Sequence, residues 1–86
     1  MTAQARTAGR INAPSAARVE AAFDGSPREV NHQPVLVLRE EWRVLDRWWT
    51  SEPVSRRYFD VVLESGEHAV VFRDEASGRW FSQRGA

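Results

Sequence analysis

Three side chains in the second half of the sequence have the chemistry to recognise a flat or anionic ligand: Tyr58, Arg73 and Trp80. An arginine stacked between aromatic rings can hold a base, a peptide or a carboxylate. The alternative is a packed cation–π cluster that only stiffens a sheet. Both interpretations require the three residues to share one face of neighbouring strands.

Two further groups could contact a partner. Trp48-Trp49 follows Arg47, and tryptophan and arginine dominate the energetics of protein interfaces. The alternative is that one of the two tryptophans plugs the open end of a sheet. Arg56-Arg57 precedes an apolar run and could contact phosphate or an acidic partner. For this pair the alternative is solvated charge, with Arg57 bound to Asp74.

Catalytic chemistry has little support in the sequence. It contains no Gly-rich phosphate loop, no HExxH motif and no spacing typical of metal ligands. The two histidines and the absence of cysteine leave too few ligands for a metal cage without added carboxylates. We therefore expect a protein without catalytic residues, without a metal and without a cofactor.

The charge and hydropathy of the sequence limit which classes of partner the protein could bind. Twelve basic residues balance twelve acidic ones, so the basic excess typical of nucleic-acid binders is missing. No apolar run approaches the roughly 18 residues that a membrane span needs, and no apolar segment of a secretory signal is present. The lack of cysteine fits a reducing compartment. We expect a cytoplasmic protein that does not contact a membrane.

The chain divides into a tail and one domain. Residues 1–17 are mostly small or polar, with too little apolar surface to offset their ordering entropy, so we expect a disordered tail. Residues 18–83 form a small β domain. Alternating or β-branched apolar runs, separated by Gly, Pro and Ser turns, predict its strands. We expect them over 18–23, 35–38, 42–45, 56–64, 67–74 and 79–81, and the short run 28–30 is only a weak candidate for a returning strand after the first turn.

The clearest element is a hairpin around Ser65-Gly66, which is typical of a two-residue turn. That turn sets Phe59 opposite Phe72 and creates an apolar core face. The next turn sets Phe72 opposite Phe81.

On the other face, the same hairpin places Tyr58 beside Arg73, and Trp80 joins them there. The predicted fold is mainly β, a small curved antiparallel meander or partly open barrel of about four to six strands.

The order of the aromatic motifs resembles a known family pattern. The motifs are Trp42-Arg43-Val44, Trp48-Trp49, Arg57-Tyr58-Phe59-Asp60-Val61, Phe72-Arg73-Asp74 and Gly78-Arg79-Trp80-Phe81. The pattern, over residues 40–82, resembles the C-terminal tail of ImuB-type proteins, which are inactive Y-family polymerase homologues of the bacterial mutasome. It also resembles a small stand-alone family of uncharacterised bacterial proteins with the same Trp-Trp and Arg-Trp-Phe signature.

The resemblance implies a non-catalytic protein-interaction module in translesion DNA synthesis or the DNA-damage response, with a replication or repair protein as its partner. The contact residues would be Trp48, Trp49, Tyr58, Arg73 and Trp80, and Arg47, Arg56 and Arg57 would meet phosphate or an acidic partner. Two alternatives stay open: a single-stranded nucleic-acid binder that uses the same aromatic and arginine face, and a structural domain with no separate binding site. The sequence leaves the oligomeric state open.

Overall fold

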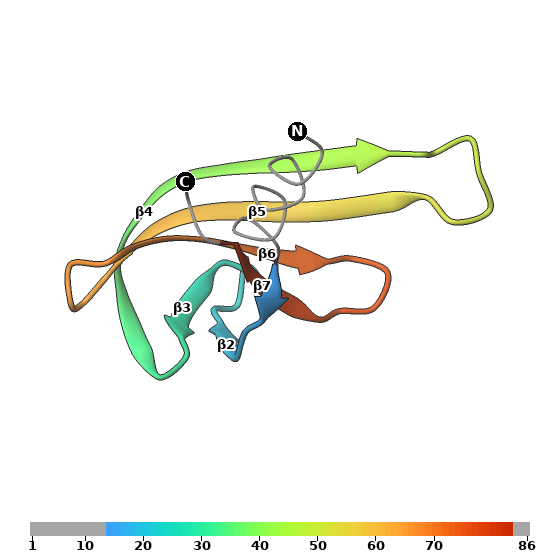
Figure 1. The fold of residues 1–86 in the computed structure, drawn as a ribbon. Coiled ribbons are helices and arrows are strands. Elements are labelled where there is room, and N and C mark those ends of the chain that lie inside the picture. Colours follow the sequence, from blue (N-terminus) through green and yellow to red (C-terminus); the bar gives the residue numbers. More distant parts are fainter. Residues whose placement is uncertain (1–13, 84–86) are drawn as a thin grey trace, which may run out of the picture.

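The computed structural model describes residues 14–83, and every regular element in that range is a β-strand. The strands form one antiparallel sheet in the order β1-β7-β6-β5-β4-β3-β2, which curls into a half-barrel (Figure 1). The predicted fold class is confirmed, with seven strands in this range rather than four to six. Their bounds are β1 Ser15–Ala16, β2 Val19–Ala21, β3 Pro27–Val30, β4 Gln33–Asp46, β5 Val54–Leu63, β6 His68–Asp74 and β7 Trp80–Gln83.

The two edges of the sheet are joined by one short stretch of chain. Strand β1 pairs with β7 and β2 pairs with β3, although only Ala17 and Arg18 separate β1 from β2. The N–H of Ala17 donates to the carbonyl of Trp80 (3.0 Å), and the N–H of Asn31 donates to the carbonyl of Arg18 (2.7 Å). This stretch therefore holds the half-barrel at both sides.

The predicted disordered tail extends too far at its C-terminal end. Ser15 pairs with Ser82 and Ala16 pairs with Phe81, so these two residues belong to the sheet. Composition misses them because their order comes from backbone hydrogen bonds to β7 rather than from buried apolar side chains. The rest of that prediction, residues 1–13, lies outside the described residues.

Strands β4 and β5 form a long hairpin whose far end projects beyond the rest of the sheet (Figure 1). The sequence predicts two strands over 35–38 and 42–45, but β4 is continuous over 14 residues. Its register shifts between Val35 and Val37 and again between Leu38 and Glu40. Such bulges bend a strand without ending it, so the charged stretch between the two runs stays within β4.

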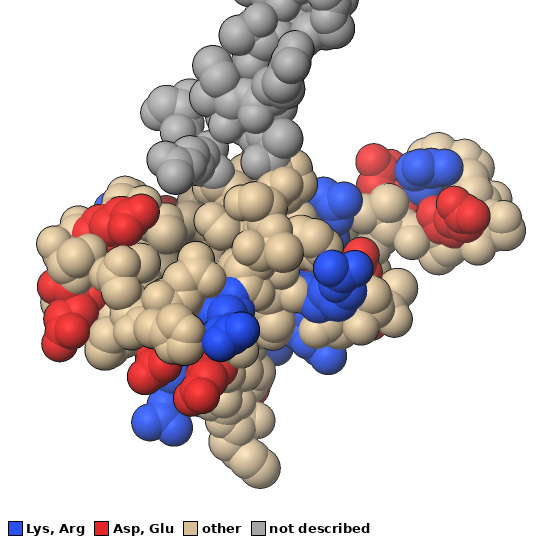
Figure 2. Space-filling view, turned by 60° about the horizontal axis from the view of Figure 1, so that its bottom comes forward, with Lys and Arg blue, Asp and Glu red and all other residues tan. Residues whose placement is uncertain are grey.

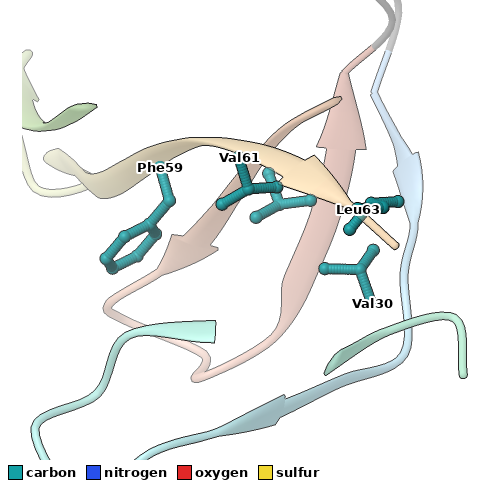
Figure 3. Packing of buried hydrophobic residues seen from close by; sticks show 5 residues of the cluster. Val30, Phe59, Val61 and Leu63 are labelled. Carbon is teal, nitrogen blue, oxygen red and sulfur yellow. The ribbon is translucent and has the colours of Figure 1, made fainter. Parts of the chain in front are cut away.

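The core lies on the concave face of the half-barrel. Phe59 and Val61 are fully buried, and Leu63 and Val30 are 3% exposed. Phe59, Val61 and Leu63 come from β5 and gather with Val30 of β3 (Figure 3), and Val71 of β6 belongs to the same cluster. We call this side of β5, β6 and β7 the core face. The prediction that Phe59 and Val61 face the core is confirmed.

The predicted register of the β5–β6 hairpin is wrong by one residue. Phe59 pairs with Val71, and Phe72 pairs with Tyr58 instead. The N–H of Leu63 donates to the carbonyl of Glu67, so the loop has three residues and not two. Gly66 takes φ +93°, as the last residue of a three-residue hairpin loop requires.

This difference of one residue places Phe72 on the opposite face from Phe59, because side chains alternate along a strand. The β6–β7 register agrees with the prediction: Phe72 pairs with Phe81, and Arg73 pairs with Trp80. Phe72 and Phe81 therefore lie together on the convex face. Trp80 lies on the core face, where its ring packs against Phe59 with centroids 5.6 Å apart.

Candidate functional site

The projecting end of the β4–β5 hairpin is a structured turn over residues 47–53. Arg47 takes a positive φ of 52° directly after Asp46, whose carboxylate accepts the N–H of Arg47. The N–H and the hydroxyl of Thr50 both donate to the carbonyl of Arg47, at 3.0 and 2.8 Å. The N–H of Glu52 donates to the Thr50 hydroxyl in turn. These hydrogen bonds position the two tryptophans between them.

Trp48 is 74% exposed and Trp49 is 65% exposed. Their rings contact edge to face, with centroids 5.6 Å apart and an interplanar angle of 88°. The idea that one of them plugs the open end of the sheet is wrong, because both lie at the projecting end of the hairpin, outside the core. We call this end, with Leu45, Trp48 and Trp49, the hairpin tip.

Leu45 is a tip residue that sequence reasoning missed. It is 64% exposed and is the second-last residue of β4, next to the turn. The sequence contained a signal for it: on a strand, Leu45 lies on the face opposite to Trp42 and Val44. An apolar residue on the opposite phase of an edge strand faces solvent unless something covers it.

The tip carries mixed charge rather than a basic surface. Its charged residues are Asp46, Arg47 and Glu52, so acidic groups outnumber the basic one. Figure 2 shows this arrangement on the projecting lobe, where basic and acidic surface lie side by side. A phosphate backbone would meet net negative charge there, whereas a protein surface with both signs could match it.

A second aromatic feature crosses the convex face of the sheet. Four rings from four strands stack in sequence, with centroids 5.3 Å apart for Trp42 and Tyr58, 4.8 Å for Tyr58 and Phe72, and 5.2 Å for Phe72 and Phe81. We call these residues the aromatic ladder. Arg56 lies 4.7 Å above the Phe72 ring. Trp42, at the end of the ladder on β4, was not among the predicted site residues, because its place beside Tyr58 comes from the pairing of β4 with β5, which the sequence did not predict.

The predicted recognition face of Tyr58, Arg73 and Trp80 does not exist as one surface. Arg73 and Trp80 pair across β6 and β7 on the core side, while Tyr58 lies in the aromatic ladder on the convex side. The error follows from the β5–β6 register, because one residue of slip moves the β6 side chains to the other face of β5. Arg73 and Trp80 are both only half-buried, and neither is exposed enough to form a projecting anchor.

The three predicted phosphate contacts are dispersed as well. Arg57 donates from Nε to a Glu41 oxygen at 2.6 Å and from Nη1 to the carbonyl of Asp24 at 3.3 Å. The predicted ion pair between Arg57 and Asp74 is replaced by these contacts, because Asp74 pairs with Arg56 in the observed register. Arg56 lies over the aromatic ladder, and Arg47 alone lies at the tip.

The turn at Asp24, whose carbonyl accepts a hydrogen bond from Arg57, predicts how stability depends on pH. Hydrogen bonds from the Ser26 hydroxyl and N–H lower the pKa of Asp24 below its usual value. A carboxylate with a lowered pKa contributes stability above its unfolded pKa, and that contribution is lost as the pH falls through its folded pKa.

Ser26→Ala removes the hydroxyl donor and keeps the backbone N–H, so we expect it to raise the pKa of Asp24 part of the way toward the unfolded value and to weaken this pH dependence. The carboxyl resonance of Asp24, followed by NMR through an acid titration, measures the shift. An unchanged midpoint in the variant would show that the Ser26 hydroxyl does not lower the pKa of Asp24. Ser77→Ala, in another turn, serves as the control.

Other site types find no support in the described range. No three His, Asp or Glu side chains among residues 14–83 gather as a metal site would need. Over the same range, no helix is long and apolar enough to cross a membrane. A scan of protein-family models, a search of curated proteins and a search of solved structures each found no match to this chain. The candidate site therefore rests on the geometry of this chain alone, and its strongest feature is the hairpin tip.

Proposed function

We propose that this protein is a non-catalytic protein-interaction module that binds its partner through the hairpin tip. The observation that supports this most is the exposure of Trp48 and Trp49, at 74% and 65%, on a turn held by its own hydrogen bonds. Large aromatic side chains held rigidly in solvent lose little conformational freedom on binding and bury a large area. Leu45, 64% exposed near the end of β4, adds a third exposed apolar side chain to the hairpin tip.

The biological setting in this proposal comes from the resemblance over residues 40–82. The Trp48-Trp49 motif lies within the pattern shared with ImuB-type tails and the related stand-alone proteins. We therefore propose a cytoplasmic partner from bacterial translesion DNA synthesis or the DNA-damage response. In this setting the module would recruit a replication or repair protein and would not act on DNA chemically.

The test is a titration of purified translesion-synthesis proteins against the wild-type chain and a Trp48→Ala, Trp49→Ala variant, followed by calorimetry. Truncating one hot-spot tryptophan costs about 2 kcal/mol or more in binding, or roughly 30-fold in affinity. We expect the double variant to lose binding that the wild type shows. Both side chains are exposed, so we expect its unfolding midpoint to stay near that of the wild type.

Phe23→Ala is the matched control, since Phe23 is fully exposed but lies in the β2–β3 turn, away from the tip. It should bind as the wild type does. Equal binding by the tip variant, or the absence of any bound protein from this pathway, would count against the proposal. Binding of a single-stranded oligonucleotide that weakens with salt would favour the nucleic-acid alternative, for which Arg47 beside two exposed tryptophans is the supporting feature.

A further inference from the structure

Strand β4 has a long edge that no other strand covers. It pairs with β3 only at Gln33 and Pro34, while its other side pairs with β5 along almost its whole length. Within residues 14–83, the edge beyond Pro34 has no neighbouring strand. All residues from Leu36 to Arg43 are exposed. An unpaired edge of this length is a template for another strand.

The hydrogen bonds of β5 show which backbone groups this edge offers. The N–H of Leu63 donates to the carbonyl of Glu67, and the N–H of Glu75 donates to the carbonyl of Ser55. Residues with odd numbers in β5 therefore direct their N–H and C=O groups toward β6. Because the direction alternates along an antiparallel strand, residues with even numbers direct theirs toward β4.

The same alternation fixes the free groups of β4. Trp42 pairs with Tyr58, so its backbone groups are directed at β5. Its two neighbours, Glu41 and Arg43, direct their N–H and C=O groups to the free edge. Their side chains share one face of the strand, and the Trp42 side chain lies on the other.

We propose that a second copy of this chain pairs with this edge, β4 against β4, antiparallel about a two-fold axis at Trp42. The backbone groups of Glu41 in one copy then bond with those of Arg43 in the other, and the reverse pair forms by symmetry. Their side chains lie opposite each other with opposite charge, an arrangement that favours cross-strand pairing. The inference is independent of the partner bound at the hairpin tip.

Charge selects this register over its neighbours. An axis at Glu41 would set that carboxylate against its own copy and Arg39 against Arg43. An axis at Arg43 would set two guanidinium groups together and Glu40 against Asp46. Like charges directly opposite one another destabilise a strand pair, so both alternatives are disfavoured. Charged residues often protect an edge from pairing, but here the two signs are placed so that self-pairing brings opposite charges together.

The aromatic ladder gains from the same symmetry. Trp42 of each copy forms a non-hydrogen-bonded pair, in which the side chains of antiparallel strands lie closest. Since Trp42 already stacks on Tyr58 with an interplanar angle of 9°, the two ladders would join at this pair. The sheet and its convex aromatic surface would then run continuously through both copies.

The test uses two charge reversals, Glu41→Arg and Arg43→Glu, in the full chain. Each variant alone would place like charges opposite each other twice and should run as a monomer by size-exclusion chromatography with light scattering. An equimolar mixture of the two variants restores opposite charges at both pairs. We expect the wild type and the mixture to reach the dimer mass as concentration rises from micromolar to millimolar, while the separate variants do not.

The mixture of the two variants controls for effects of each substitution on the fold of its own chain. Glu41 binds Arg57 and Arg43 binds Glu75, so each reversal also breaks an internal ion pair. Those losses are the same before and after mixing, and circular dichroism checks that each variant is folded. A wild type that stays monomeric, separate variants that dimerise, or a mixture that stays monomeric would each overturn the proposal.

A second pair of variants keeps the test valid if a charge reversal fails to fold. Arg43→Pro removes an N–H directed at the free edge and leaves the bonds from β4 to β5 in place, since proline is tolerated at edges. Arg43→Thr removes the same side chain but keeps the N–H. We expect the proline variant to be monomeric and the threonine variant to retain dimers at the highest concentrations. Equal dimerisation of both would overturn the proposal.

Discussion

Replacing Phe59 with alanine should lower the free energy of unfolding by about 3–5 kcal/mol, the usual cost of removing a buried phenylalanine. Phe59 has no exposed surface and packs against the Trp80 ring, and the guanidinium of Arg57 lies 5.0 Å from its centroid. A domain of this size is stable by only about 5–15 kcal/mol, so the variant should be close to unfolding. Urea denaturation followed by tryptophan fluorescence measures the loss.

Phe23→Ala provides the contrast, because it removes the same ring from a site that is fully exposed. Its effect should fall within about 0.5 kcal/mol, as for other surface substitutions. A loss below about 1 kcal/mol for Phe59→Ala would contradict the burial of its ring, since even conservative core truncations cost that much. The comparison therefore tests where the single core of this small domain lies.

The positions of most strands and of the β6–β7 turn could be predicted from the sequence because local patterns specify them. The Gly78 turn fixed the pairing of Phe72 with Phe81, and the prediction of that register is confirmed. Trp48 and Trp49 likewise lie between the predicted strands over 42–45 and 56–64, in the turn that joins β4 to β5. Alternation on β5 correctly placed Phe59 and Val61 in the core.

The register of β5 against β6 could not be obtained in the same way. Strand β6 carries apolar residues on both phases, such as Val70-Val71, so hydrophobic alternation does not show which face of β6 meets the core face of β5. The choice then depends on whether the loop has two or three residues. A glycine after Glu64 and Ser65 fits either loop, and the two alternatives differ by one residue of register.

That ambiguity has a physical origin in the two-sided burial of the central strands. β5 and β6 are covered on the concave side by the core and on the convex side by their own aromatic ladder. Phe72 is 1% exposed although it lies outside the main core cluster. The candidate site moved for the same reason: Tyr58 became part of the covered convex surface, whereas Trp48 and Trp49 of the hairpin tip are strongly exposed.

A double-mutant cycle separates the two registers directly. In the observed structure Phe72 contacts Tyr58, with centroids 4.8 Å apart, and Phe59 lies on the opposite face. We expect a coupling energy of about 0.5–1.5 kcal/mol between Tyr58→Leu and Phe72→Leu, as for other aromatic pairs. Between Phe59→Leu and Phe72→Leu we expect additivity within about 0.5 kcal/mol, because the side chains do not meet.

Leucine is the right replacement because it keeps most of the buried volume, so each variant should stay folded and the cycle can be closed by urea denaturation. If Phe59 were opposite Phe72, the reverse result would be expected: strong coupling between the two phenylalanines and no coupling between Phe72 and Tyr58. That result would return Tyr58 to the face of Arg73 and restore the recognition surface that the sequence predicted. The expected result instead leaves Trp48 and Trp49, at the hairpin tip, as the predicted contact residues that are free to bind a partner.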